Sequence, residues 1–466
     1  MALAFIPDIP LLEGRRVTVM GLGLFGGGVG VARFLARRGA RVTVTDLKTE
    51  HELRESVAEL RDLPVRLRLG GHDEADFRDA DLVVVNPAVP ESSPWLRLAR
   101  ALETEMNLFF KLCRARTVVG VTGSNGKTTT TTLLGEILRR GLPRVWVGGN
   151  IGGSLLEHVD EIGPDDRVVL ELSSFQLENL GVLRRSPSVG AVLNLSPNHL
   201  DRHGTMENYA AAKRQIVAHQ REGDAKVLNA DDPLVREFRS ASPSRTYFFS
   251  RRERPARGAF VQGDQILFYT TGARFAIDVS RRRLPGAFNL DNMAAAAAAS
   301  FAAAGGRWEG WREACEEVFS TFPGVEHRLE FVAEKRGVRY YNDSKATDPE
   351  ATVAALETLP GPFVLILGGY DKKTPFDALA RAVAERPVRA CVLIGQTAPA
   401  LEAALRAQAR VPEIVRAESL EEAVRVPARP GETVLLSPAC ASWDMFRNFA
   451  ERGRAFKALV AALPDG

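Results

Sequence analysis

Apolar positions in the first part of the chain form short β-branched runs separated by stretches with helical spacing. The runs at 16–21, 41–46 and 81–86 read RVTVMG, RVTVTD and DLVVVN, and each has the length of a buried strand. Strands that alternate with helices in this way form a parallel sheet covered on both faces. The pattern therefore predicts a Rossmann-like α/β domain at the N-terminus.

The same rhythm restarts at 116–141, where RTVVGVTGSNGKTTTTTLLGEILRRG indicates a strand, a glycine loop and a helix. Two further buried-strand patterns, at 166–176 and 189–199, both end in polar residues. Between about 245 and 285 the pattern changes to short alternating strands with charged turns, which predicts a small antiparallel addition. The alanine-rich stretch at 293–304 is too short to span a bilayer and predicts a packed helix.

A linker-like segment, TFPGVEHR, precedes a third α/β unit. This unit contains four segments in which an apolar strand leads into a loop, and they begin at residues 338, 362, 389 and 432. We therefore predict an α/β protein with three domains. They are an N-terminal Rossmann-like domain at 1–112, a central P-loop domain at 113–322 with a mononucleotide-binding parallel sheet, and a C-terminal Rossmann-like domain at 323–466. Open parallel sheets bind ligands at the carboxyl ends of their strands, so the polar loops there are the candidate sites.

Composition narrows the class of protein without assigning a function. A chain that is 45% hydrophobic and 26% charged is typical of globular proteins, and a net charge of +3 is weak support for a nucleic-acid partner. The cysteines Cys113, Cys315, Cys391 and Cys440 form no metal-binding or disulfide pattern, which favours a reducing compartment. The N-terminus lacks the basic region of a signal peptide. We expect a cytoplasmic monomer without a nucleic-acid or membrane partner.

The first glycine loop has the spacing Gly21-x-Gly23-x-x-Gly26, and the next strand ends in Asp46. Taken alone, this is the fingerprint of a dinucleotide-binding dehydrogenase, in which a helix N-terminus receives a pyrophosphate. A nicotinamide-dependent oxidoreductase is therefore one hypothesis that the residues raise.

The second glycine loop, GVTGSNGKTTTT, contains Gly123, Gly126, Lys127 and Thr128 between a strand and a helix. A phosphate loop needs small residues so that backbone N–H groups point into one concavity, a lysine for the terminal phosphates and a hydroxyl for Mg²⁺. The strict Walker spacing is not met, because Val121 stands at the first glycine position. A dehydrogenase has no use for this loop and a simple kinase has none for the first. A nucleotide-sugar together with ATP would use both, and a non-catalytic nucleotide-binding regulator is a further alternative.

Polar side chains cluster after several other predicted strands. Glu171 ends one strand and is a natural Mg²⁺ ligand opposite a phosphate loop, while the serines after it also form a helix-capping signal. His199 and Asp201 follow the next strand, where a ligand role and a structural role are equally supported. Lys213 lies on a predicted helix, and its spacing alone indicates a solvated lysine. In the third unit, lysines and serines at strand ends suit a carboxylate-bearing substrate.

Seven motifs together resemble the Mur ligases of peptidoglycan synthesis along nearly the whole chain. They are TGSNGKTT, GGNIG, ELSSFQLE, NHLDRH, HR at 327–328, DSKAT and SPACAS. The combination of DSKAT, ELSSFQLE and SPACAS is specific to the branch that adds D-glutamate, and the D-N-P-R-type run of the diaminopimelate- and lysine-adding members is missing. Folylpolyglutamate synthases share the ATP loop and lack the N-terminal domain. Another Mur-type or folylpolyglutamate-type ligase therefore stays an alternative.

The resemblance implies an ATP-dependent amide ligase that adds D-glutamate to UDP-N-acetylmuramoyl-L-alanine through an acyl phosphate. The ATP site would contain Gly123, Ser124, Asn125, Gly126, Lys127, Thr128, Thr129, Asn292, Arg328 and Asp343. The nucleotide-sugar would contact Gly21, Leu22, Gly23, Asp46, Leu47, Lys48, Asn150, Ser173 and Gln176. The D-glutamate pocket would contain Lys345, Thr347, Lys372, Ser442 and Phe449.

The resemblance also implies two Mg²⁺ ions, with Thr128, Glu171, His199 and Lys213 as the metal-site residues. Lys213 falls where the family carries a carbamylated lysine, whose two anionic oxygens can ligate or orient Mg²⁺ as an ammonium cannot. The implied catalytic residues are Lys127, Glu171, His199, Lys213 and Lys345.

Overall fold

The computed structural model describes residues 12–23, 27–87, 89–90, 92–151, 153–196, 200–284, 286–371 and 374–464, with the backbone alone for 200 and 201. The described chain forms two compact units. The first contains the residues up to 281 together with 290–320, and the second contains 282–289 and the residues from 321 onward. The first unit carries two sheets and the second carries one, which confirms the α/β architecture with three domains. The domain boundaries proposed from the sequence stay a prediction.

The N-terminal sheet is parallel throughout, with the strand order β3-β2-β1-β4-β5. Its strands are β1 (Arg16–Met20), β2 (Arg41–Asp46), β3 (Val65–Leu69), β4 (Leu82–Val85) and β5 (Leu102–Thr104). Its helices are α1 (Gly27–Arg37), α2 (Arg54–Ala58), α3 (Glu74–Arg78), α4 (Glu105–Leu112) and the 3₁₀ turn η1 (Pro94–Leu98). The strand order reverses between β1 and β4, and this crevice is where open sheets of this type bind nucleotides.

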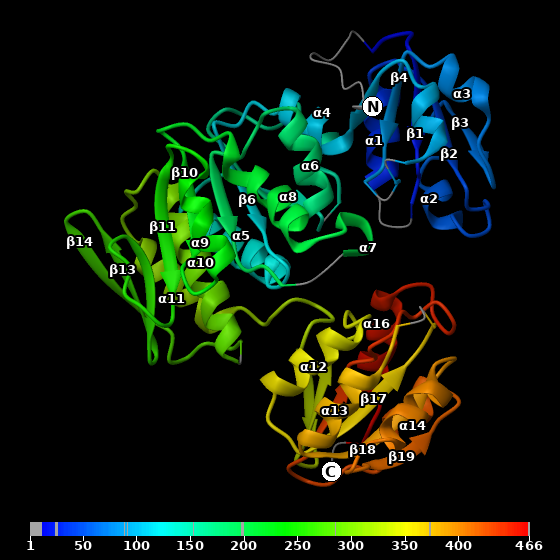
Figure 1. Cartoon of the computed structure of the whole chain (residues 1–466), viewed down its shortest axis with the longest axis vertical. Helices are drawn as coiled ribbons and strands as arrows, with labels where there is room; N and C mark the ends of the chain where they lie inside the picture. Colours follow the sequence, from blue (N-terminus) through cyan, green and yellow to red (C-terminus); the bar gives the residue numbers. More distant parts are fainter. Residues whose placement is uncertain are drawn as a thin grey trace. The chain divides into compact units, whose positions relative to one another are not determined.

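The central sheet has the order β14-β13-β12-β11-β10-β9-β6-β8-β7 (Figure 1). Its strands are β6 (Thr117–Thr122), β7 (Val145–Gly149), β8 (Arg167–Glu171), β9 (Val189–Val192), β10 (Ala225–Asn229), β11 (Arg245–Ser250), β12 (Gly258–Gln262), β13 (Gln265–Thr270) and β14 (Ala273–Asp278). Its helices are α5 (Lys127–Gly141), α6 (Ser174–Val182), α7 (Leu200–His203), α8 (Met206–Ala218), α9 (Pro233–Glu237), α10 (Ala287–Ala303) and α11 (Trp311–Thr321), with the 3₁₀ turns η2 (Leu155–His158) and η3 (Phe238–Ala241).

The antiparallel addition is smaller than the sequence pattern suggests. Strands β12, β13 and β14 pair antiparallel, as expected, but β11 at 245–250 pairs parallel with both β10 and β12. The alternation in β11 resembles that of a hairpin strand, and its direction is determined by the crossover through α9, which local periodicity does not reveal. The alanine-rich stretch forms α10 as predicted, and its alanines from 294 to 299 are fully buried.

The sheet of the second unit has the order β15-β16-β20-β17-β18-β19 and is parallel except at β15. Its strands are β15 (Glu330–Lys335), β16 (Val338–Asn342), β17 (Phe363–Gly368), β18 (Val388–Ile394), β19 (Glu413–Arg416) and β20 (Thr433–Leu436). Its helices are α12 (Pro349–Thr358), α13 (Asp377–Glu385), α14 (Ala398–Arg406), α15 (Leu420–Val424) and α16 (Phe449–Ala461).

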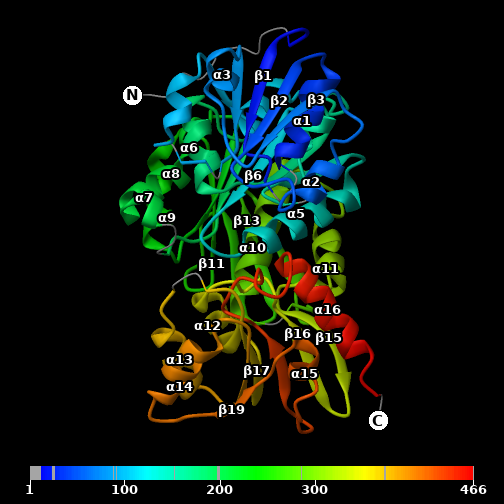
Figure 2. The same ribbon diagram turned by 90° about the vertical axis from the view of Figure 1, so that its right-hand side faces the viewer.

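Alternate residues of the strands in this second unit face two separate cores. Leu365 and Leu367 of β17 pack under α12, α13 and α14, whereas Val364 and Ile366 pack under α15 and α16. Figure 2 shows these two helical layers on opposite faces of the sheet. A period of two on a strand that is buried on both faces explains why these runs are continuously apolar.

Within the first unit, α4 contacts α6 and η2 of the central part, and α1 also contacts η2. Arg38, just after α1, reaches the Asp160 carboxylate with bonds of 2.7 and 2.9 Å. These contacts hold the two sheets of this unit together. None of the helices among the described residues is long and apolar enough to cross a membrane.

A buried ion pair joins α4 to β5 of the N-terminal sheet and provides a test of the packing there. The Lys111 ammonium bonds the Glu103 carboxylate, whose side chain is fully buried. Because removal of one partner leaves the other charge buried and unpaired, we expect Lys111→Met to lower the free energy of unfolding by about 3–5 kcal/mol. The double variant Glu103→Gln/Lys111→Met removes both charges and should recover most of the loss in denaturant titrations. Equal stability of Lys111→Met and the parent would contradict this account.

Candidate active site

The second glycine loop lies between β6 and α5, as the sequence predicts. Gly126 caps α5 in the left-handed region at φ 82°, and a Cβ there would lie 2.3 Å from Oδ1 of Asn292 on α10. Gly123 has φ 155°, and a Cβ there would lie 2.9 Å from the Leu193 side chain. Only glycine fits both constraints, so the loop brings its backbone and the positive end of α5 to the sheet edge, where an anion is stabilised.

Lys127 is folded over this loop. Its ammonium donates to the carbonyl oxygens of Gly123 and Ser124 at 3.0 and 2.9 Å. These are neutral acceptors, so a phosphate oxygen can replace them as a stronger, charged partner. The next residues, Thr128 and Thr129, are buried in the first turn of α5, where a hydroxyl can meet a metal bound to phosphate.

Side chains and backbone groups from outside the loop hold it in place. Asn194, two residues after β9, accepts from the amide of Asn125 at 2.8 Å and donates to its carbonyl oxygen at 3.1 Å. The Ser124 hydroxyl donates to the Ser196 carbonyl oxygen at 3.0 Å and lies 3.1 Å from the hydroxyl of Tyr209. Sequence reasoning missed Asn194 and Tyr209. The only local signal was that Tyr209 precedes Lys213 by one helical turn.

Glu171 ends β8 beside the loop and is almost fully buried. Its Oε1 accepts from Nδ2 of Asn150 at 3.1 Å, while its Oε2 has no hydrogen-bond partner among the described residues. A buried carboxylate oxygen without a partner carries a large desolvation penalty. The amide of Asn150 also donates to the Glu171 carbonyl oxygen, which fixes both residues at one sheet edge.

The donor set fits Mg²⁺ of the kind that is shared with phosphates. Such an ion needs one or two carboxylates, a hydroxyl and phosphate oxygens, and Glu171 with Thr128 can supply the protein's share. The described residues contain no cluster of three or more His, Cys, Asp or Glu side chains that would hold a metal alone. His199, expected as a further ligand, lies outside the described residues, and so does the side chain of Asp201.

Lys213 is buried, contrary to the solvated lysine that its spacing alone indicates. Its ammonium donates to Oγ1 of Thr122 at 3.2 Å and to the Gly123 carbonyl oxygen at 3.1 Å, and it lies over the ring of Tyr209 at 4.8 Å. Burial and repulsion from Lys127 bring the pKa of Lys213 well below its usual range, against the attraction of Glu171. A neutral amine at this position is a nucleophile.

The first glycine loop has a different internal contact. Oδ2 of Asp46 accepts from the amides of Leu22 and Gly23 at 2.9 and 3.1 Å, and its Oδ1 accepts from the amide of Lys48 at 2.9 Å. Asp46 therefore shapes the loop directly. Leu47 is 69% exposed beside it. Gly21 has φ 92°, as a tight turn requires, and Gly26 lies outside the described residues.

Ser173 and Gln176 form a capping box at the start of α6. The Ser173 hydroxyl accepts from the Gln176 amide at 3.3 Å, and Oε1 of Gln176 accepts from the Ser173 amide at 2.9 Å. The structural interpretation of these residues is therefore confirmed, and a contact with substrate remains a prediction.

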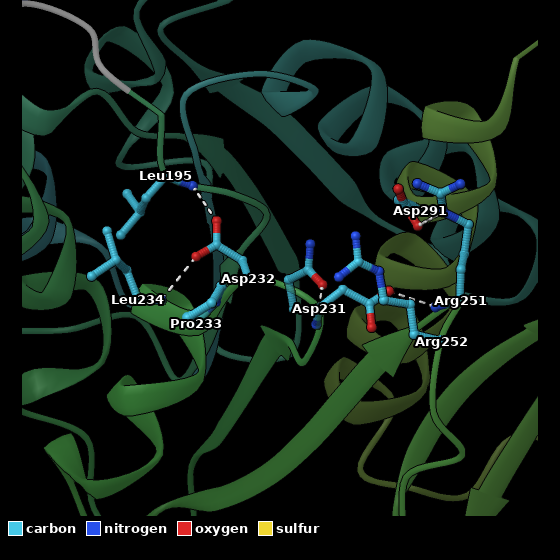
Figure 3. A pocket seen from close by; sticks show the side chains of 9 residues that line it. Leu195, Asp231, Asp232, Pro233, Leu234, Arg251, Arg252 and Asp291 are labelled. Atoms are coloured by element: carbon cyan, nitrogen blue, oxygen red, sulfur yellow. Dashed lines mark hydrogen bonds and ion pairs between the residues drawn. The ribbon is translucent and has the colours of Figure 1, made fainter.

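A pocket of about 540 Å³ opens at the carboxyl ends of β9, β10 and β11 (Figure 3). Its lining residues are Leu195, Asn229, Asp231, Asp232, Pro233, Leu234, Arg251, Arg252 and Asp291. Oδ2 of Asp232 accepts from the Leu195 amide at 2.7 Å, and Asp291 pairs with Arg251 at 2.8 Å. Leu195 follows the asparagine that holds the phosphate loop, and Asp291 precedes Asn292. The pocket therefore adjoins that loop and can hold a polar nucleoside.

In the second unit, the DSKAT segment follows β16. Lys345 lies over the ring of Phe449, the first residue of α16, at 5.9 Å, and its amide donates to the His327 carbonyl oxygen at 3.0 Å. Ser442 is buried, and Thr347 is half-buried near the start of α12. Lys372 lies outside the described residues. The structure thus brings Lys345 and Phe449 together, as a pocket for an amino acid would need.

Asp343 is deeply buried at the end of β16. Its Oδ2 accepts from the Ser437 hydroxyl at 2.8 Å and its Oδ1 from the Leu329 amide at 3.1 Å. Burial raises the pKa of Asp343 to about 7, although Ser437, Leu329 and Arg328 favour the carboxylate. Arg328 therefore lies close enough to Asp343 to affect its pKa, and an ATP contact of either residue stays a prediction.

Comparisons with known proteins match all three sheets of the chain to one group of enzymes. Residues 15–107 match the family model described as "Mur ligase MurD-like, N-terminal domain". Residues 121–300 match "Mur ligase middle domain", and residues 327–440 match "Mur ligase, glutamate ligase domain".

Relatives with similar sequences extend this match over the full length. The UDP-N-acetylmuramoylalanine–D-glutamate ligase of Roseiflexus sp. strain RS-1 is 48% identical, over 96% of this chain and 99% of that protein. The enzyme of the same name from Symbiobacterium thermophilum is 47% identical, over 96% and 98%.

Two solved structures share the fold at low sequence identity. The UDP-N-acetylmuramate-alanine ligase of Thermotoga maritima aligns with a TM-score of 0.63 at 20% identity, over 96% of this chain and 99% of that one. A MurF ligase from the same organism, in complex with ADP, aligns with a TM-score of 0.58 at 19% identity, over 97% and 99%.

The burial of Asp343 predicts a pH-dependent stability. Its pKa is about 7 when folded against 3.8 as the ordinary value, so the folded chain binds more protons in this range. Asp343 therefore contributes its full stabilisation at a pH below its unfolded-state pKa of 3.8. This stabilisation is lost as the pH rises through its folded-state pKa of about 7. The Asp343→Asn variant has no carboxyl group at this position, so its unfolding temperature should not show this pH dependence. We expect the parent to lose stability relative to the variant from about pH 4 to about pH 8, and parallel curves would contradict the assignment.

Proposed function

The chain belongs to the Mur ligase family, and from that premise we propose that it is an ATP-dependent ligase that joins D-glutamate to UDP-N-acetylmuramoyl-L-alanine in peptidoglycan synthesis. One observation carries the proposal: a glycine loop at the positive end of a helix lies beside the buried Glu171, one oxygen of which has no partner in the part of the chain that the structure describes, and the same unit holds a second nucleotide-type loop. Two anionic substrates need both loops, and an oxidoreductase would leave the Gly123–Thr128 loop without a role.

The reaction has two stages. An oxygen of the alanyl carboxylate attacks the γ-phosphorus of ATP, so that a C–O–P bond forms and ADP leaves. The amine of D-glutamate then attacks the acyl carbon, loses a proton, and expels inorganic phosphate as the amide forms. A carboxylate resists nucleophiles, and phosphorylation makes its oxygen a leaving group. Catalysis is therefore mostly positioning and stabilisation of charge.

The residues divide this work as follows. The amides at Gly126 and the Lys127 ammonium bind the terminal phosphates, and Asn292 supports the loop at Gly126. Thr128 and Glu171 would hold Mg²⁺, which supplies positive charge where the transferring phosphoryl group becomes more negative. Asn150 holds Glu171 in place.

The nucleoside of ATP, the UDP group and D-glutamate would each bind at a different place. The pocket at Leu195 and Asp291 suits the nucleoside of ATP. The first glycine loop, shaped by Asp46, would take the UDP diphosphate, with the uracil near Leu47. Lys345 and Phe449 would contact D-glutamate.

We further propose that Lys213 is carbamylated. A neutral amine attacks carbon dioxide, an N–C bond forms and one proton is released, which leaves a carbamate with two anionic oxygens. The low pKa of Lys213 favours the neutral form, and the position beside Lys127 and the phosphate loop favours an anion afterwards. The carbamate would orient the metal together with Glu171.

The ligation proposal predicts the release of ADP and phosphate only when ATP, UDP-N-acetylmuramoyl-L-alanine and D-glutamate are all present. Lys127→Ala should lower the rate at least about 10²–10³-fold, because it removes charge stabilisation from the transition state. Calorimetry should show that this variant still binds the nucleotide-sugar. An ATPase-coupled screen of all D- and L-amino acids tests which amino acid the enzyme adds to the nucleotide-sugar. Equal activity with other amino acids would overturn the D-glutamate assignment.

The carbamate predicts a ¹³C NMR signal from enzyme equilibrated with ¹³C-bicarbonate. Lys213→Met should abolish this signal. Lys226 is the matched control, since it is also buried, its pKa is also lowered by burial, and it donates to the Ser242 carbonyl oxygen. Lys226→Met should keep the signal. An active parent enzyme without any carbamate signal would contradict the proposal.

A further inference from the structure

The two sheets of the first unit meet at a contact made by Arg202, in α7. Its Nη1 donates to the carbonyl oxygen of Pro87 at 2.8 Å, although the two residues are 115 positions apart in the chain. Pro87 follows β4 of the N-terminal sheet, so the bond joins the carboxyl-end loops of two different sheets. The same guanidinium lies over the ring of Phe175 at 4.0 Å. One cation thus has a hydrogen-bond acceptor in a loop of the N-terminal part and an aromatic ring on α6 of the central part.

On the N-terminal side, the loop that Arg202 holds is part of the wall of the first glycine loop. The amide of Asn86, next to Pro87, donates to the Met20 carbonyl oxygen at 2.9 Å, and its side-chain nitrogen lies 3.3 Å from the carbonyl oxygen of Gly21. A Cβ at Gly21 would lie 2.8 Å from the Cβ of Asn86. A shift of Pro87 would therefore move the loop at Gly21.

On the central side, Phe175 at the start of α6 belongs to a cluster of packed rings that also contains His203 and Tyr209. Its ring stacks on the imidazole of His203 with 5.2 Å between centroids and an interplanar angle of 7°. That imidazole is held at both nitrogens, by the Ser174 hydroxyl at 2.9 Å and by the Glu178 carboxylate at 3.2 Å. The Arg202 guanidinium therefore rests on groups whose positions are set by α6 itself.

This cluster of rings also contacts the phosphate loop. The imidazole of His203 packs against the ring of Tyr209 at 5.2 Å, and the hydroxyl of Tyr209 lies 3.1 Å from that of Ser124. Contacts thus run without a gap from Pro87 beside the first glycine loop to Ser124 in the second. Two loops that must hold two parts of one reaction need a fixed separation, because a misplacement of about 1 Å can lower a rate about 10²-fold.

We propose that Arg202 is a positioning residue for the ligation, which holds the nucleotide-sugar loop at a fixed distance from the ATP loop. The inference rests on the proposed function, since it needs a substrate that spans both loops. Arg202 itself is exposed, so its removal leaves the cores of both sheets intact. The guanidinium is suited to this role because its planar fork can donate to a carbonyl oxygen while its face stacks on an aromatic ring.

Arg38 provides a matched control. It joins the same two parts of the first unit, with bonds of 2.7 and 2.9 Å to the Asp160 carboxylate, and it also lies over an aromatic ring, that of Phe34, at 4.6 Å. Its contact follows the carboxyl end of α1, at the opposite end of the helix from the glycine loop. Loss of Arg38 should weaken the attachment of the two sheets without disturbing either loop.

The experiment compares Arg202→Leu, Arg202→Lys and Arg38→Leu with the parent, by steady-state kinetics, calorimetric binding of UDP-N-acetylmuramoyl-L-alanine and of a non-hydrolysable ATP analogue, and thermal unfolding. Arg202→Leu should raise the KM and Kd for the nucleotide-sugar about tenfold and lower kcat by a similar factor, with little change in ATP-analogue binding. Arg202→Lys should recover part of this loss, since it keeps the charge. Arg38→Leu should lower the unfolding temperature without changing either KM.

Two results would overturn the inference alone: unchanged kinetics in Arg202→Leu, or the same kinetic loss in Arg38→Leu as in Arg202→Leu. In both cases the parent enzyme binds the nucleotide-sugar, so the proposed function stands. A parent enzyme that binds no nucleotide-sugar would instead overturn the proposed function, and the role of Arg202 with it.

Discussion

The loss of water around charged groups at the second glycine loop is the constraint on which the rest of the site depends. Lys213 is buried next to the Lys127 ammonium, and both burial and this neighbour lower its pKa and favour the neutral amine, while Glu171 is buried with one oxygen unpartnered among the described residues. Such an arrangement is unfavourable unless ligands complete it. On the proposed function, a triphosphate would supply negative charge for the loop amides and Lys127, and a magnesium ion would supply a partner for Glu171. Ligand binding would therefore relieve the cost of burying these groups.

The two glycine loops show how one strand–loop–helix design serves two purposes. In the first, the Asp46 carboxylate already occupies the amides of Leu22 and Gly23, so the loop is shaped by an internal anion. In the second, the side chains nearest the helix cap at Gly126 are those of Asn292 and Leu193, which are uncharged, and the Lys127 ammonium lies over the loop. The side chains around the two loops therefore differ, although both loops lie at the start of a helix.

Sequence patterns with local causes could be predicted well. Buried parallel strands, the phosphate loop and the capping box at Ser173 and Gln176 all depend on residues a few positions apart, and the structure contains each of them. Features that depend on residues far apart in the sequence could not be predicted in this way. The parallel direction of β11, the support of the loop by Tyr209 and the contact of Arg202 with Pro87 join residues brought together only by the fold. The burial of Lys213 belongs to this second class, because helical spacing alone favoured an exposed lysine.

In the proposed reaction, the carboxylate of the nucleotide-sugar and the γ-phosphate of ATP react directly with each other. Ligation of UDP-N-acetylmuramoyl-L-alanine with ¹⁸O at both oxygens of the alanyl carboxylate, followed by mass spectrometry of the released phosphate, tests this reaction. The account predicts one ¹⁸O atom in each phosphate, transferred when the acyl phosphate breaks down. Phosphate without the label, alongside formation of the amide product, would contradict it.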